Sequence, residues 1–151
     1  MEESQISGVV INVLRPTDND IEFLFLLRSG GIFKGQWWPV TGTSKVNESP
    51  IQTALRELNE ETNLTPERIY LLGKKIEHMD KTSKLEAYVA FAQSNSAVVL
   101  NYEHSEYKWL KLKEVLQILP KSTQPVIEYI YANFVAQTPP KELLAWAAER
   151  E

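Results

Sequence analysis

Residues 42–64 read GTSKVNESPIQTALRELNEETNL and hold the most specific pattern in the chain. On a helix, at about 100° per residue, Glu57, Glu60 and Glu61 fall on one face. Like charges three and four residues apart repel, so a helix that gathers carboxylates in this way loses stability unless cations bind there. Carboxylate oxygens favour a hard divalent metal, and metal held by carboxylates is typical of phosphate chemistry.

The sequence marks both ends of this helix. Ser49 is the expected N-cap, Pro50 the first helical residue and Gln52 the third position of a capping box. Asn63 can adopt the left-handed conformation that ends a helix, and Pro66 prevents the helix from continuing.

The two faces of the predicted helix differ in character. A largely apolar stripe is expected to pack on a sheet, while Arg56 and the three glutamates face a cleft. Taken alone, such an acidic face is more often simply solvated, as charge runs on surface helices usually are. The apolar stripe consists of Ile51, Leu55, Leu58 and Thr62, with Ala54 at its edge.

The spacing of the charged residues favours a functional site over a solvated face. Gly42, Glu48 and the run Arg56–Leu64 resemble the Nudix box, G-x5-E-x7-R-E-U-x-E-E-x-G-U, where U is a bulky aliphatic residue. Every specified position matches except the last glycine, which is Asn63 in this chain. The departure is mild, because asparagine readily replaces glycine in a left-handed conformation. The chain is therefore identified as a member of the Nudix superfamily (MutT-like).

The composition is that of an ordinary globular protein. With 151 residues, 43% hydrophobic and 24% charged, the chain is expected to form a single domain over residues 1–151. The lack of cysteine excludes disulfides, thiolate zinc sites and cysteine nucleophiles. The N-terminus MEESQISG lacks the hydrophobic region of a signal peptide, and no apolar run is long enough to span a membrane. A cytoplasmic protein without a membrane partner is the expectation.

The formal net charge of −4 and the lack of a basic stripe argue against a nucleic-acid polymer as partner. They do not argue against a small polyphosphate substrate, because bound metal ions reverse the local field at a carboxylate site. The sequence leaves open whether the protein is a monomer or a homodimer.

Hydrophobic patterning predicts strands on both sides of the 42–64 segment and helices later in the chain. These elements favour an α/β/α sandwich with a mixed central sheet, and the resemblance implies the same Nudix fold, with the box as a loop-helix-loop. A Pro-Pro break introduces the tail, residues 137–151, in which 142–150 is compatible with a helix. The expected strands cover 7–14, 21–27, 69–76, 85–92 and 107–110, with a short extended segment at 37–41, and the expected helices cover 113–119 and 123–134.

A phosphoanhydride hydrolase must neutralise developing charge, activate a water and hold the leaving phosphate. Mg²⁺, or Mn²⁺ in its place, suits hard oxygen ligands and bridges substrate phosphates. Glu57 and Glu61 are the first choices as metal ligands. Glu60 is a third, directly or through water, and the carbonyl of Gly42 can add another because glycine allows close approach of the backbone.

Two further box residues are expected to support the catalytic site. From its role in the family, Arg56 orients and charge-balances the glutamates, the alternative being an exposed ion pair of little consequence. Glu48 precedes the N-cap and is expected to support the loop or an outer metal shell, with direct ligation as the alternative.

A second group of candidates lies in the motif E-H-x-x-Y-x-W-L, which begins at Glu103. A glutamate just before a late strand resembles the additional carboxylate that several Nudix enzymes use as metal ligand or general base. Glu103 and Glu57 are the two candidates for the base. His104 is more often a loop hydrogen-bonder than a base in such a position, and Tyr107 and Trp109 are expected to pack in the core.

Substrate recognition is expected from residues outside the box. Arg28 ends a predicted strand and can meet phosphate, and Lys34 in the next loop can do the same if it is not merely solvated. Trp37 and Trp38 are candidates for stacking on a purine or pterin ring. Adjacent residues of a strand point to opposite faces, so only one of the two tryptophans is expected to face the cleft.

The resemblance also bears on the substrate. The segment W-W-P-V-T-G, with E-H-x-x-Y-x-W-L, resembles the dihydroneopterin triphosphate or dATP pyrophosphohydrolases, which release pyrophosphate from a triphosphate. Some diadenosine tetraphosphate hydrolases also carry E-H-x-x-Y-x-W, so a diadenosine polyphosphate hydrolase is the alternative. A Nudix-fold binding or regulatory module without turnover is a third reading, disfavoured because such modules usually lose box carboxylates.

Overall fold

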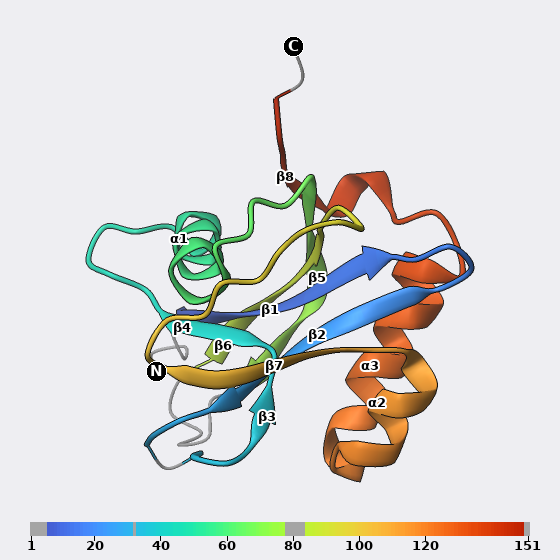
Figure 1. Cartoon of the computed structure of the whole chain (residues 1–151). Helices are drawn as coiled ribbons and strands as arrows, with labels where there is room; N and C mark the ends of the chain where they lie inside the picture. The colour runs from blue at the N-terminus through green and yellow to red at the C-terminus, as the bar shows by residue number, and fades with distance from the viewer. Residues whose placement is uncertain (1–5, 32, 78–83, 150–151) are drawn as a thin grey trace.

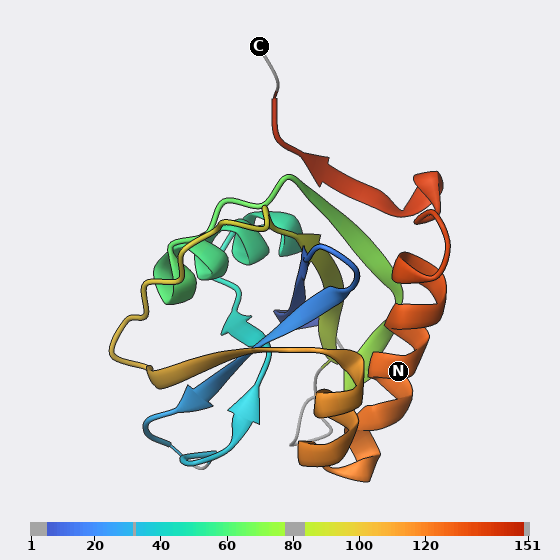
Figure 2. The ribbon, with the colours of Figure 1, turned by 45° about the vertical axis from the view of Figure 1, so that its right-hand side comes forward.

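A single mixed sheet organises the chain, as the computed structural model shows for residues 6–31, 33–77 and 84–149 (Figure 1). One helix, α1, covers one face of this sheet, and α2 and α3 cover the other (Figures 1 and 2). This is the α/β/α sandwich that the sequence predicts. The helices are α1 (Pro50–Thr62), α2 (Leu112–Ile118) and α3 (Gln124–Ile130), and the strands are β1 (Ile6–Pro16), β2 (Ile21–Arg28), β3 (Trp37–Trp38), β4 (Val40–Thr43), β5 (Arg68–Glu77), β6 (Lys84–Phe91), β7 (His104–Leu110) and β8 (Leu144–Ala147).

The sheet is mixed because β1 has parallel and antiparallel neighbours. Along the main path the strand order is β3-β2-β1-β6-β5-β8, with β4 paired to β1 and β7 paired to β2. β1 runs parallel to β6 and antiparallel to β2 and β4. Two pairings bring distant segments together: Gly42 lies opposite Val9, and His104 lies opposite Arg28.

The core has two halves, one on each face of the sheet. Central strands that are buried on both faces carry apolar residues without interruption, and successive side chains go to alternate faces. The half between α1 and the sheet includes Ala54 and Leu58 of that helix. The half between α3 and the sheet includes Ile127 and Ile130 of that helix. No helix in the described ranges is long and apolar enough to cross a membrane.

Helix α1 has the ends that the sequence predicts. The Ser49 hydroxyl accepts from the Gln52 backbone N–H at 3.3 Å, and the Gln52 side chain accepts from the Ser49 backbone N–H at 2.9 Å, which completes the capping box. Asn63 takes the left-handed conformation with φ 61° and ends the helix. The final position of the box therefore accepts asparagine in place of glycine without a change of backbone.

The buried face of α1 differs from the predicted one. Glu57 and Glu61 lie on the same buried face as Ala54 and Leu58, since positions 54, 57, 58 and 61 follow the helical repeat. Ile51 and Leu55 are only half-buried. The expectation of an apolar face separate from all three glutamates is wrong: two of the carboxylates are packed against the sheet, and Glu60 alone is exposed.

The C-terminal tail also departs from expectation. Residues 144–147 form β8, which pairs antiparallel with β5, with Ile69 opposite Trp146. A helix over 142–150 is therefore wrong for this segment, and its last residue lies outside the described ranges. The free edge of β5 offers backbone partners, and Trp146 packs against the α1 half of the core, so tertiary contacts override local preference.

Candidate functional site

Arg56 is the centre of a hydrogen-bond network that gathers the acids of the box. Its Nε and Nη2 donate to the two carboxylate oxygens of Glu48 at 2.8 and 2.9 Å. Its Nη1 donates to Glu57 Oε1 at 2.6 Å and to Glu60 Oε2 at 3.2 Å. Nη2 also donates to the Thr43 carbonyl at 2.9 Å, which ties the network to β4. One guanidinium therefore fixes the positions of three glutamates.

The Glu48 carboxylate accepts hydrogen bonds from other residues besides Arg56. Its Oε1 also accepts from the Lys45 backbone N–H at 2.9 Å and from Thr53 Oγ1 at 2.8 Å. The Arg56 guanidinium first, then the Lys45 amide, hold the pKa of the Glu48 carboxyl well below its usual range. Both oxygens are engaged by the protein, which fits a supporting role for Glu48 better than direct metal ligation.

Arg56→Lys is expected to lower activity by about tenfold to a hundredfold, the usual range for residues that orient metal ligands. Lysine cannot reproduce the planar fork that holds Glu48 while also reaching Glu57. The matched control is Arg15→Lys, because Arg15 forms one partly exposed pair with Glu22 at 2.9 Å. Steady-state kinetics of both variants would check this, and equal activities would contradict the orienting role of Arg56.

Gly42 and Glu57 are in close contact. A Cβ atom placed on Gly42 would lie 2.2 Å from both Cγ and Cδ of Glu57. Glu57 is 7% exposed, with its Oε1 already held by Arg56, so it has little room to retreat. The absence of a side chain at position 42 thus lets the Glu57 carboxylate lie against β4.

A buried cluster lies beside this network. Glu61 from α1, Glu103 from the turn before β7 and His104 at the start of β7 each contribute a ligand atom within 4.8 Å of the others. Glu61 is 0% exposed and His104 is 4% exposed. The Nδ1 of His104 lies 3.5 Å from Glu61 Oε1. Segments far apart in the sequence thus bring two carboxylates and an imidazole together.

The electrostatics of this cluster show a shortage of positive charge. Burial first, then the neighbouring Glu57 and Glu103, raise the pKa of Glu61 to about 10. Burial first, then the positive charge of Arg28, lower the pKa of His104 to about 4, so His104 is neutral near pH 7 and does not compensate Glu61. Within the described part of the chain, the positive charge of Arg28 acts in the opposite direction and lowers the pKa of Glu61.

The residues of this cluster fit a divalent cation. Both carboxylate oxygens of Glu61 and both ring nitrogens of His104 are buried, and none has a hydrogen-bond partner among the described residues. Buried polar atoms left in this state are costly, so they indicate a missing ligand. Carboxylate oxygens suit Mg²⁺, and an added imidazole is compatible with Mn²⁺.

The structure divides the predicted metal ligands into two sets. Glu61 and Glu103 meet in the buried cluster, where Glu57 lies close enough to raise the pKa of Glu61. Glu57 and Glu60 also belong to the Arg56 network, each through one oxygen. Ligation by the Gly42 carbonyl stays a prediction.

His104 has a larger place in the site than its sequence suggests. It is the first residue of β7, and its backbone lies opposite Arg28. The expected loop hydrogen bond from its side chain is not among the described contacts. The pairing of β2 with β7 and the backbone hydrogen bond from Val99 to Thr62 place it near Glu61, and no local signal in the sequence could have indicated this.

The candidate substrate residues lie on different faces. Trp37 packs against the α3 half of the core, with Lys108 Nζ 4.7 Å from its ring centre. Trp38 lies opposite Leu26, which belongs to the α1 half of the core. The ring centres of Trp38 and Phe33 are 4.7 Å apart. Only Trp38 therefore shares a face with the acidic cluster, which confirms that the two tryptophans face opposite ways.

Arg28 and Lys34 also separate. The Nη1 of Arg28 donates to Thr41 Oγ1 at 3.4 Å, and its Nε is buried without a partner in the described part of the chain. Arg28 is thus within electrostatic reach of Glu61 and His104. Lys34 is exposed in the turn that follows β2.

Of the two aromatics expected in the core, only Trp109 is packed. It lies against the α1 half and under the guanidinium of Arg15 at 4.2 Å. Tyr107 is 43% exposed, so that expectation is wrong. The reason is that β7 lies at the border of the sheet, where it pairs only with β2 among the described strands.

Comparisons with known proteins agree with this geometry. A protein-family model described as "NUDIX domain" matches residues 6–134. A bis(5'-nucleosyl)-tetraphosphatase [asymmetrical] of Sus scrofa is 33% identical over 104 residues, which are 65% of this chain and 69% of that protein.

Two solved structures share the fold, each with a TM-score of 0.73. One is a Caenorhabditis elegans Ap4A hydrolase binary complex, 24% identical, with 85% of this chain and 98% of that chain covered. The other is the NUDIX domain of Shewanella oneidensis NrtR complexed with ADP ribose, 25% identical, with 87% and 89% covered.

Proposed function

The chain belongs to the Nudix family and is a hydrolase of phosphoanhydrides, and we propose that its substrate is a dinucleoside tetraphosphate. The observation that carries this proposal is the likeness to asymmetrical bis(5'-nucleosyl)-tetraphosphatases, one of them 33% identical. Unequal cleavage of a chain of four phosphates gives a nucleoside monophosphate and a nucleoside triphosphate. With two adenosines, the products would be AMP and ATP.

This proposal reverses the order of the two substrates expected from the sequence. The segment W-W-P-V-T-G favoured a triphosphate pyrophosphohydrolase, whereas E-H-x-x-Y-x-W-L is compatible with either class. The curated relatives support the tetraphosphate alternative better than the dATP or dihydroneopterin triphosphate reading. The triphosphates therefore become the competitors in the test.

In the proposed reaction, Glu61 and His104 would hold a divalent metal, with the Glu103 carboxylate beside it. Bound there, the metal would neutralise charge on the phosphates and lower the pKa of a water. Arg56 keeps Glu57 and Glu60 beside this centre through its hydrogen bonds. His104 is neutral at pH 7, as a metal-binding imidazole must be.

Of the two candidate bases, Glu103 is favoured. A general base needs a free lone pair within hydrogen-bond reach of the water. Glu57 has one oxygen committed to Arg56 at 2.6 Å, which leaves fewer of its lone pairs for a water. Glu103 is only half-buried, and the described hydrogen bonds at this residue are made by its backbone N–H and carbonyl, not by its carboxylate.

Substrate contacts are proposed on the α1 face of the sheet. Arg28 brings a positive charge next to the cluster, where it can meet a phosphate oxygen. Trp38 and Tyr107 flank Leu26 on this face, one from β3 and one from β7, and offer flat surfaces to a nucleobase. Lys34 and Trp37 have no comparable support in the structure.

The test is a comparison of kcat/KM for diadenosine tetraphosphate, dATP and dihydroneopterin triphosphate with Mg²⁺, with products separated by chromatography. From diadenosine tetraphosphate we expect equal amounts of AMP and ATP. Its kcat/KM should be at least about a hundredfold above that for either triphosphate, which corresponds to about 2.7 kcal/mol in activation free energy. Formation of ADP alone would exclude asymmetrical cleavage. Release of pyrophosphate from a triphosphate that is faster than cleavage of diadenosine tetraphosphate would favour a triphosphate pyrophosphohydrolase instead.

A further inference from the structure

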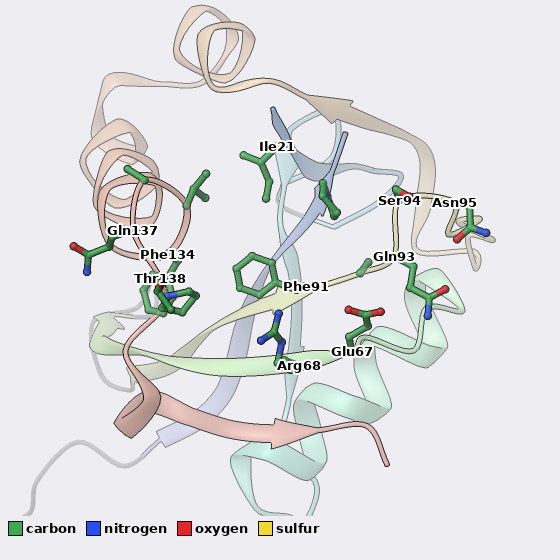
Figure 3. Close-up of a pocket in the computed structure, with 15 residues that line it drawn as sticks. Ile21, Glu67, Arg68, Phe91, Gln93, Ser94, Asn95, Phe134, Gln137 and Thr138 are labelled. Carbon is green, nitrogen blue, oxygen red and sulfur yellow. The ribbon is translucent and has the colours of Figure 1, made fainter. Parts of the chain in front are cut away.

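A large groove lies on the α3 face of the sheet, away from the acidic cluster (Figure 3). Its volume is about 970 Å³, in the range of pockets that take small molecules. None of the residues of the Arg56 network or the Glu61 cluster lines it. The strand register explains the separation, because Gly42 pairs with Val9 near the start of β1, whereas Pro16 at the end of β1 lines the groove.

The groove exists because α3 does not cover the whole sheet. The helix passes into a π-helical turn at Tyr131–Val135, and the chain then leaves through Ala136 towards Pro139. π-helical turns are rare and occur frequently at functional sites. Phe134 and Val135 of this turn form one wall, and the segment that follows β6 forms another.

A charged residue stands where the apolar face of β5 would otherwise continue. Tyr70 and Leu72 alternate into the α3 half of the core, and Arg68 is the next residue of this row. Arg68 is exposed in the groove and lies directly opposite Phe91 of β6. In Figure 3 the Arg68 guanidinium points into the hollow beneath the Phe91 ring.

Among the residues that the structure describes, none neutralises the charge of Arg68 through an ion pair. Glu67, the other charged residue of the groove, is likewise not paired with Arg68 in the described part of the chain. The remaining polar groups are neutral amides and hydroxyls, among them Gln93 and Gln137 on opposite sides of the hollow (Figure 3). These amides and hydroxyls can donate hydrogen bonds to an anion and accept hydrogen bonds from the polar groups of a ring.

The aromatic side chains supply a flat apolar surface next to this charge. The Phe91 ring meets Tyr70 edge-on at 5.8 Å, and Tyr70 meets Phe134 at 5.9 Å. Phe91 is only half-buried, so part of its ring is left for another partner. A guanidinium can bind an anionic group, and the free part of the ring beside it can contact a planar ring that carries this group.

We propose that this groove is a second binding site, for a small anion that carries a flat ring. Arg68 holds the anionic group, Phe91 contacts the ring, and the amides of Gln93 and Gln137 bind its polar edge. The site lies on the opposite face of the sheet from the acidic cluster, so it does not depend on which polyphosphate is hydrolysed.

The test is an NMR titration of the metal-free protein in EDTA, because removing metal weakens phosphate binding at the acidic cluster. AMP is the probe, while adenosine and inorganic phosphate each supply one half of its chemistry. We expect saturable shifts of the backbone amides at 93–95 and 136–138 with AMP, and binding at least about tenfold weaker with either half.

Variants connect the shifts to the two recognition groups. Arg68→Gln is expected to weaken AMP binding by about tenfold or more, and Phe91→Leu to reduce it to the affinity of phosphate alone. Lys113→Gln, which removes an exposed charge from α2, is the matched control and should bind AMP as the wild type does.

Three results would overturn the proposal. The first is AMP shifts confined to the amides around Gly42, Glu61 and Glu103. The second is an Arg68→Gln variant that binds AMP as tightly as the Lys113→Gln control. The third is the lack of any saturable shift up to about 10 mM AMP.

Discussion

Glu61→Gln is expected to abolish Mg²⁺-dependent turnover while the metal-free protein stays folded. The amide keeps the shape of the side chain but removes the charge that the proposed metal requires. Losing about 4 kcal/mol of charge stabilisation corresponds to a fall in kcat of at least about a thousandfold. The matched control is Glu106→Gln, because Glu106 is an exposed carboxylate on β7 and is expected to leave turnover unchanged.

The same variant tests the buried charge through the pH dependence of stability. The folded-state pKa of Glu61 is raised from 4.5 to about 10, so the unfolded chain releases this proton at a lower pH than the folded protein. Its contribution to the stability of the metal-free protein is therefore fully present below pH 4.5 and is lost as the pH rises towards 10. Glutamine does not titrate, so Glu61→Gln should lose less stability over this range.

Thermal unfolding in EDTA and in Mg²⁺ measures both effects. For the wild type, Mg²⁺ should raise Tm, because an ion that binds only the folded state stabilises it. For Glu61→Gln, the Tm in EDTA should exceed that of the wild type at pH 8, and Mg²⁺ should change it little. Wild-type turnover in the variant, or an unchanged response of Tm to Mg²⁺, would remove Glu61 from the metal site.

Gly42→Ala is expected to give the second large loss of activity. Its Cβ would lie 2.2 Å from Cγ and Cδ of Glu57, so the Glu57 side chain must move away from β4. That movement disrupts the short bond from Arg56 and displaces a carboxylate next to the metal site. Misplacement by about 1 Å can cost about a hundredfold in rate, and overpacking of this kind costs about 1–3 kcal/mol of stability.

Gly30→Ala is the matched control for this substitution. A Cβ atom at Gly30 would meet no atom within 4 Å, so both activity and stability should stay close to wild type. Steady-state kinetics and urea unfolding of the two variants would separate the local clash from a general effect of replacing glycine. A Gly42→Ala enzyme with the kinetics of Gly30→Ala would mean that Glu57 can move without consequence.

The features that the sequence predicts well are short-range. The capping box at Ser49, the left-handed Asn63 and the order of strands and helices all follow from residues a few positions apart. The glutamates of the box were also identified as a group, because helical spacing alone places them together. The support of Glu48 by its own loop belongs to the same class, since Lys45 and Thr53 lie on either side of it.

The features that were wrong or missed depend on contacts between distant segments. The tail forms β8 because the edge of β5 offers it backbone partners, and Tyr107 is exposed because, among the described strands, β7 pairs with β2 alone. His104 joins the cluster because the β2–β7 pairing brings it beneath the end of α1. Periodicity within one element contains no information on which other element will lie against it.

The sequence by itself determined the family, the box helix with its ends, and the chemistry of the acidic residues. Local hydrogen bonds and the helical repeat determine these features, and both can be recognised from spacing. Only the tertiary structure decided that Glu61 is buried without a hydrogen-bond partner among the described residues, that Glu103 and His104 complete its site, and that α3 leaves a groove above Arg68. The reason is that burial and the loss of water at a side chain depend on which strands and helices pack together, and a charge becomes costly only once that packing is complete.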